Sequence, residues 1–212
     1  MSIFANCPPS ASIGDVPIAE CLEDVGQIQK AVLSRVNSAV GTPNTVAAPS
    51  TLAAWTPKLA AADGTKVVQT PYFTEPTAEA GAAKTFGGGN QTLGGVPIII
   101  GREPTPFTAK FLQTAQNSIA ALKKFMGESN LGVYLIDEYG NILARRVESD
   151  AAEVYRPIPI KAFFVSDKTF GGFDNPDTNM VSWNFLPNWS DELAIITPAA
   201  GFNPLEDLVT PA

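Results

Sequence analysis

Apolar positions at helical spacing make residues 106–126 the clearest single element of the chain. They recur every three to four residues, which predicts one continuous apolar face on a long amphipathic helix. Thr105 is a suitable N-cap, Pro106 fits the first helical position, and Gly127 is typical of a helix end. The apolar face is expected to consist of Phe107, Phe111, Ala115, Ile119, Leu122 and Met126.

Alternating apolar and polar residues predict strands in much of the remaining chain. Val181, Trp183 and Phe185 alternate with polar residues, and residues 133–147 predict a hairpin around a polar turn. Residues 25–36 fit both a helix stripe and a strand face, and their β-branched residues favour the strand. Further elements are expected at 65–70, 98–100 (a buried strand), 158–165, 193–197 and 204–208 (a short helical turn).

About eight strands and one long helix indicate an α+β protein that is mainly β. We expect an antiparallel β-sandwich or small barrel with the helix of 106–126 packed on it, and we find no internal repeat. Proline and glycine in residues 1–20 predict an extended N-terminal arm, with a frayed terminus as the alternative. Residues 21–212 then form a single β-rich domain with long loops at 74–95 and 166–179.

The balance of charges narrows the function classes. Charged residues make up only 17% of the chain, and the net charge is −7. So few charges favour an assembly component whose surface is largely covered, since an ordinary soluble protein has about 25%. The acidic balance argues against a nucleic-acid-binding surface, although a channel lined with carboxylates would let DNA slide without sticking.

No targeting or membrane signal is evident in the sequence. The first residues lack the basic start and apolar core of a signal peptide. No apolar run approaches the roughly 20 residues that a membrane-spanning helix needs. We therefore expect synthesis in a cytoplasm and no membrane partner.

Candidate chemistry is sparse because the chain contains no histidine. Cys7 and Cys21 are too few for a structural zinc site, and we expect free thiols, with an N-terminal disulfide as the alternative. Lys84-Thr85 precedes the glycine run, which is the wrong order for a P-loop. Adjacent carboxylates such as Asp137 and Glu138 are typical of solvated turns. We predict no catalytic residue, no metal, no cofactor and no enzymatic activity.

One cluster supports a different hypothesis. Trp183, Trp189 and Asp191 combine aromatic rings with a carboxylate, the pattern that an enzyme or a carbohydrate-binding module would use. Core or interface packing is the alternative role for these aromatic residues.

The order of several short motifs resembles a group of small structural proteins from tailed phages and prophages of Bacteroidetes-type hosts. These motifs span most of the chain and are residues 26–30, Trp55 with 61–67, Thr70-Pro71, 87–92, 134–142, 158–160 and 188–191. The chain looks most like a tail tube subunit of that group. A head decoration or head–tail connector protein is the alternative.

The resemblance implies a virion protein located in the phage tail. It implies a β-sandwich or small barrel whose copies form hexameric rings, stacked by long loops and terminal arms. Such rings form a tube through which DNA passes without specific binding, and the partners are further copies and other virion proteins. We predict an assembly interface that contains Phe86, Gly87, Gly88, Gly89, Asn90 and Trp189.

Overall fold

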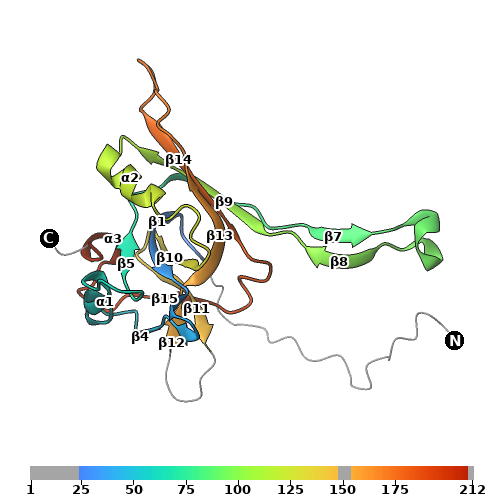
Figure 1. Ribbon diagram of the computed structural model, residues 1–212, viewed down its shortest axis with the longest axis horizontal. Coiled ribbons are helices and arrows are strands. Elements are labelled where there is room, and N and C mark those ends of the chain that lie inside the picture. Colours follow the sequence, from blue (N-terminus) through green and yellow to red (C-terminus); the bar gives the residue numbers. More distant parts are fainter. Residues whose placement is uncertain (1–23, 148–153, 210–212) are drawn as a thin grey trace.

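The computed structural model describes residues 24–147 and 154–209 and is mainly β (Figure 1). The predicted N-terminal arm, Cys7 and Cys21 lie outside the described residues. The strands are β1 Ile28–Arg35, β2 Asn37–Ala39, β3 Thr42–Pro43, β4 Val46–Ala47, β5 Val67–Gln69, β6 Thr74–Ala78, β7 Ala83–Phe86, β8 Ile98–Arg102, β9 Thr105–Leu112, β10 Leu131–Asp137, β11 Ile142–Val147, β12 Val154–Arg156, β13 Ile158–Val165, β14 Thr178–Phe185 and β15 Leu193–Ile196. The helices are α1 Leu52–Leu59, α2 Gln116–Lys123 and α3 Pro204–Asp207, with short 3₁₀ turns η1 Gly89–Gln91 and η2 Leu93–Gly95.

Eleven strands form one curled antiparallel sheet. Its main path runs β4-β12-β11-β10-β13-β14-β9-β6. Off this path, β1 pairs with β10 and with β5, and β15 pairs with β11. Strands β12 and β13 are separated only by Pro157. Strand β12 pairs with β11, whereas β13 pairs with both β10 and β14. The curl brings β9 and β14 over the face of β1 and β10, because residues of all four strands share one core cluster.

Strand β10 lies between two apolar clusters and is buried along its whole length. Successive side chains of a strand point to opposite faces. Val133 and Leu135 therefore pack toward β9, β14 and helix α2, whereas Tyr134 and Ile136 pack toward α1 and the C-terminal segment. On that second side, Trp55 of α1 meets Tyr134 edge-on at a ring-centroid distance of 5.0 Å. Trp55 is thus a core residue.

The long helix predicted over 106–126 is wrong. Residues 105–112 form strand β9, which pairs with β14 along its length, and a short helix, α2, begins only at Gln116. Phe107 and Phe111 are four residues apart, a spacing that fits one helix face and one strand face equally well. Burial in β9 alternates strictly, with Thr105, Phe107, Ala109 and Phe111 inside, which is the period of a strand.

The segments expected as long loops contain ordered β structure. Residues 74–95 include β6, β7 and two 3₁₀ turns, and β7 pairs with β8 in a separate two-stranded sheet. The strand predicted at 98–100 is present, but its predicted burial is wrong because all three isoleucines are exposed. In 166–179, a bridge between Thr169 and Thr178 joins the two sides of the loop, and β14 begins at Thr178.

The remaining strand predictions agree with the structure. Strand β1 lies within 25–36, β10 and β11 form the predicted hairpin, and β13, β14 and β15 cover the other expected segments. The turn at Asp137 differs from the solvated turn that was predicted, because this side chain is buried. Its carboxylate accepts hydrogen bonds from the backbone of Tyr139 at 3.0 Å and Asn141 at 2.8 Å, so it organises the turn from inside.

Candidate assembly interface

The most prominent surface feature is the hairpin of β7 and β8, hereafter the arm (residues 83–102). In Figure 1 it projects far from the rest of the fold. Its strands pair in antiparallel register, with Thr85 opposite Ile99 and Phe86 opposite Ile98, and a bulge next to Lys84. Among the described residues the arm is a sheet of two strands, so the outer edge of each strand presents backbone groups without a partner strand there.

Apolar side chains cover both faces of the arm. Ile98 is 57% exposed, Ile99 68% and Phe86 57%. Consecutive strand residues point to opposite faces, so Ile98 and Ile99 place isoleucine on each side of the ribbon. Burying such a side chain stabilises by roughly 1.5–3 kcal/mol. An exposed apolar ribbon of this kind marks a protein contact site.

The tip of the arm is held by its own hydrogen bonds. The hydroxyl of Thr92 accepts a bond from the backbone N–H of Gly88 at 3.2 Å and donates one to the carbonyl of Val96 at 2.8 Å. Gly87, Gly88 and Gly89 all have positive φ, which glycine adopts at little cost. Asn90 follows as an exposed residue of η1. The predicted interface residues 86–90 therefore lie together at the outer end of the arm.

The sixth predicted interface residue, Trp189, lies elsewhere. Its indole stacks on Phe185 at a ring-centroid distance of 4.4 Å and is only partly exposed. It lines a cavity together with Arg102 at the base of the arm. The Arg102 guanidinium also donates a hydrogen bond to the side chain of neighbouring Asn188. Trp189 thus supports the base of the arm and is separated from the tip.

The loop between β13 and β14 (residues 166–177), hereafter the second projection, carries two exposed aromatic residues that the sequence reasoning missed. Phe170 is 81% exposed and Phe173 is fully exposed, both in the loop that precedes β14. Figure 1 shows this loop extending away from the arm, at the outer end of β14. A signal was available in the sequence, because Lys-Thr-Phe-Gly-Gly occurs at 84–88 and again at 168–172. This pentapeptide is a short internal repeat, so the expectation of none is wrong.

The outer arm carries no charge, because residues 85–101 contain no Asp, Glu, Lys or Arg. The ion pairs among the described residues lie on the body, for example Arg35–Glu128 at 3.2 Å and Lys110–Glu75 at 2.6 Å. A hydrogen bond from Arg145, together with its positive charge, holds the pKa of the Glu192 carboxyl below its usual range. Contacts made by residues 85–101 therefore depend on apolar burial and backbone hydrogen bonds.

The carbohydrate hypothesis loses one of its aromatic residues. Trp183 is 1% exposed and is stacked on Phe107 at a ring-centroid distance of 4.1 Å. A sugar cannot reach a ring that is covered in this way, so Trp183 is a core residue. Trp189 and Asp191 both line the cavity at the base of the arm.

Within residues 24–147 and 154–209, no three side chains of His, Cys, Asp or Glu are grouped closely enough to hold a metal ion. No helix in this part of the chain is long and apolar enough to cross a membrane. Comparison of the chain with protein-family models, with curated proteins and with solved structures finds no match.

Proposed function

We propose that this chain is a non-enzymatic structural subunit that assembles with further copies of itself through the arm. The observation that carries the proposal is the exposure of Phe86, Ile98, Ile99 and Ile100 on a ribbon that has no sheet or helix of residues 24–147 and 154–209 against either face. An isolated two-stranded hairpin is marginally stable in water. A neighbouring subunit would cover these side chains and stabilise the ribbon.

The geometry of the arm favours an open or cyclic assembly. The arm extends in one direction from the body, and a contact between the arm of one copy and the body of the next would join two different surfaces. Such a head-to-tail contact generates rings when the rotation closes and filaments when it does not. The free strand edges also suit β-augmentation, in which backbone hydrogen bonds continue from one chain to the next.

The finer proposal is a tail tube subunit of a phage particle. The mainly β body, the projecting arm and the order of the motifs at 87–92 and 134–142 support it. Copies would form hexameric rings that stack into a tube within the virion, in contact with other virion proteins. The net charge of −7 suits a conduit in which DNA passes without specific binding.

Negative-stain microscopy and size-exclusion chromatography of the purified protein test this proposal. Rings or tubes are expected, and a monomer that persists at high concentration would reject it. If the particles cosediment with empty capsids and not with tails, a head decoration or connector protein is the correct assignment. No cofactor needs to be added.

A variant without the arm isolates its role. The backbone N–H of Glu103 donates to the carbonyl of Ala82 at 2.9 Å, so the two ends of the arm are adjacent. Replacing residues 83–102 by Asn-Gly, a favoured hairpin turn, should leave a folded monomer. A second variant replaces Ile98, Ile99 and Ile100 by threonine, which keeps the strand and removes its apolar surface. Both variants should lose the rings.

A further inference from the structure

The two projections of the molecule carry the same pentapeptide. Lys-Thr-Phe-Gly-Gly occupies residues 84–88, which run along β7 to the tip of the arm, and residues 168–172 in the loop before β14. The two segments extend in different directions in Figure 1. In each copy of the pentapeptide the phenylalanine is exposed, at 57% for Phe86 and 81% for Phe170.

The threonine has the same structural role in both segments. Thr85 pairs with Ile99 across the arm. Thr169 forms an antiparallel bridge with Thr178, in which the two backbones exchange hydrogen bonds of 2.7 and 3.0 Å. In both cases the next residue is the phenylalanine, so each aromatic ring lies just beyond the paired threonine, toward the tip of its projection.

The first glycine allows a close crossing of the chain in both segments. A Cβ on Gly87 would lie 2.2 Å from the Thr92 side chain, and a Cβ on Gly171 would lie 1.9 Å from the Asn175 carbonyl oxygen. Both distances are too short for any other residue. The first glycine therefore brings the returning chain against the pentapeptide at both sites.

The second glycine has positive φ in both segments, +120° at Gly88 and +70° at Gly172, and open space around it. The segments differ in that Gly87 also has positive φ, whereas Gly171 does not. The pentapeptide nevertheless repeats the roles of threonine, phenylalanine and both glycines. A repeat of sequence, exposure and backbone role indicates a repeat of binding function.

We propose that the two projections are duplicate docking elements, each of which inserts its phenylalanine into the same pocket of a second copy of this chain. The inference rests on the proposed self-assembly and names its receptor site. Each element also presents a lysine two residues before the ring, Lys84 or Lys168. Neither lysine forms an ion pair with any of the described residues.

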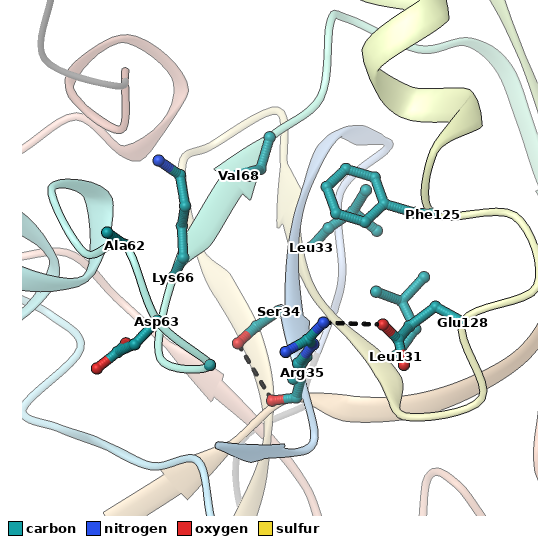
Figure 2. Close-up of a pocket in the computed structure, with 11 residues that line it drawn as sticks. Leu33, Ser34, Arg35, Ala62, Asp63, Lys66, Val68, Phe125, Glu128 and Leu131 are labelled. Carbon is teal, nitrogen blue, oxygen red and sulfur yellow. Dashed lines mark hydrogen bonds and ion pairs between the residues drawn. The ribbon is translucent and has the colours of Figure 1, made fainter. Parts of the chain in front are cut away.

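The pocket of Figure 2 has the chemistry that such an element requires. Leu33, Val68, Phe125 and Leu131 supply apolar lining, with Phe125 near Leu33 in the view. Its volume is about 380 Å³. Sites that accept a small ligand span roughly 300–1,000 Å³.

Asp63 and Glu128 stand on opposite sides of this pocket, which is also lined by the cations Arg35 and Lys66, and Asp63 is the carboxylate that we assign to the incoming lysine. Glu128 is paired with Arg35 at 3.2 Å on one side, whereas Asp63 on the other side forms no ion pair with the described residues. Asp63 accepts a hydrogen bond from the backbone of Thr65 at 2.8 Å and a second from its hydroxyl, which together hold its pKa below the usual range. Its negative charge at neutral pH is available to an incoming lysine.

Each copy has two docking elements and one such pocket, so the two elements compete for it. Losing one phenylalanine leaves the other to occupy the pocket. Assembly should therefore tolerate Phe86→Ser or Phe170→Ser alone better than the double substitution.

Peptide binding tests the inference without requiring assembly. The probes are fluorescein-labelled peptides of residues 82–90 and 166–174, and the receptor is the full chain with Phe86→Ser and Phe170→Ser. Fluorescence anisotropy should show that both peptides bind and displace each other. A serine in place of the peptide phenylalanine should weaken binding at least tenfold, and Asp63→Lys in the receptor should also weaken it. Glu79→Lys, an exposed carboxylate outside the pocket, is the matched control.

The outcomes separate this inference from the proposed function. Absence of binding, binding that ignores the phenylalanine or Asp63, or simultaneous binding of both peptides overturns the inference. Rings in the microscope without peptide binding keep the proposed function and reject the shared pocket. Peptide binding by the receptor, when the unsubstituted chain forms no rings, keeps the pocket and rejects the tube.

Discussion

Strands β8 and β10 have similar apolar sequences and opposite environments. Ile98, Ile99 and Ile100 of β8 are all more than half exposed, whereas Val133 and Ile136 of β10 are 0% exposed. Strand β10 has strands on both edges and a core cluster on each face, but within the part of the chain that the structure describes β8 has only β7 beside it. An apolar strand thus identifies a surface that needs covering, and the covering can come from the same chain or from another one.

The largest contrast is expected when one isoleucine is truncated in each strand. Ile136→Ala removes buried methyl groups from the core and should lower the free energy of unfolding by about 2–5 kcal/mol. Ile99→Ala is the matched variant, and it should change that free energy by less than about 0.5 kcal/mol. Urea denaturation checks both values. A large loss of stability in Ile99→Ala would mean that the arm is part of the core.

Glycines of the two regions provide the second contrast. A Cβ on Gly132 of β10 would lie 2.9 Å from the Pro157 side chain, inside the body. Gly132→Ala should therefore destabilise the whole fold by about 1–3 kcal/mol, since overpacked cores respond in that way.

Gly87→Ala should instead disturb only the tip of the arm, where the new Cβ meets Thr92. Thermal unfolding of the body should be unchanged, while hydrogen exchange at the tip becomes faster. Equal loss of thermal stability in Gly87→Ala and Gly132→Ala would contradict the separation between arm and body.

The turn that closes β10 and β11 gives a third contrast, of similar size to the second. Asp137 is buried and accepts hydrogen bonds from Asn141 through its backbone at 2.8 Å and its side chain at 2.9 Å. Asp137→Ala leaves these donors without a partner and should cost about 1–3 kcal/mol in urea denaturation. Asp174→Ala, at an exposed position of the second projection, is the control and should be neutral. Similar losses from the two substitutions would show that burial of Asp137 has no special importance.

The smallest expected effect is on the stability of the fold at low pH. The Arg145 hydrogen bond and charge lower the pKa of Glu192 in the folded protein, so this pair stabilises the fold above the unfolded pKa. That stabilisation is lost as the pH falls below about 4.3, the ordinary pKa of glutamate. Glu192→Gln should therefore reduce the drop in melting temperature between pH 7 and pH 3, whereas Glu79→Gln should not. An unchanged drop in Glu192→Gln would show that the pair contributes nothing measurable.

The β class and most strand positions could be predicted because alternation and turn residues are local signals. The helix over 106–126 could not be excluded, since Phe107 and Phe111 satisfy both periods and the deciding evidence is the pairing of β9 with β14. The exposure of residues 98–100 could not be predicted either, because the apolar character of a strand does not tell whether its own chain or another chain covers it. These errors share one cause, which is that tertiary partners select among local possibilities.

The candidate interface was predictable in part. The glycine run identified residues 86–90 as an unusual segment, and the structure places them at the tip. The role of Trp189 could not be predicted, because its contact with Phe185 is set by the path of the loop after β14. Phe170 and Phe173 were overlooked, although the repeated pentapeptide was visible in the sequence.

The hydrogen bond between Glu103 and Ala82 makes the arm a unit whose length can vary independently of the body. Adding one residue to each of β7 and β8 would move the tip outward by about 3.4 Å and turn its side chains over, whereas adding two to each would move it by about 6.8 Å and restore their orientation. The arm would then act as a ruler that sets the spacing between neighbouring copies. Even increments would preserve the contact, and odd increments would present its opposite face.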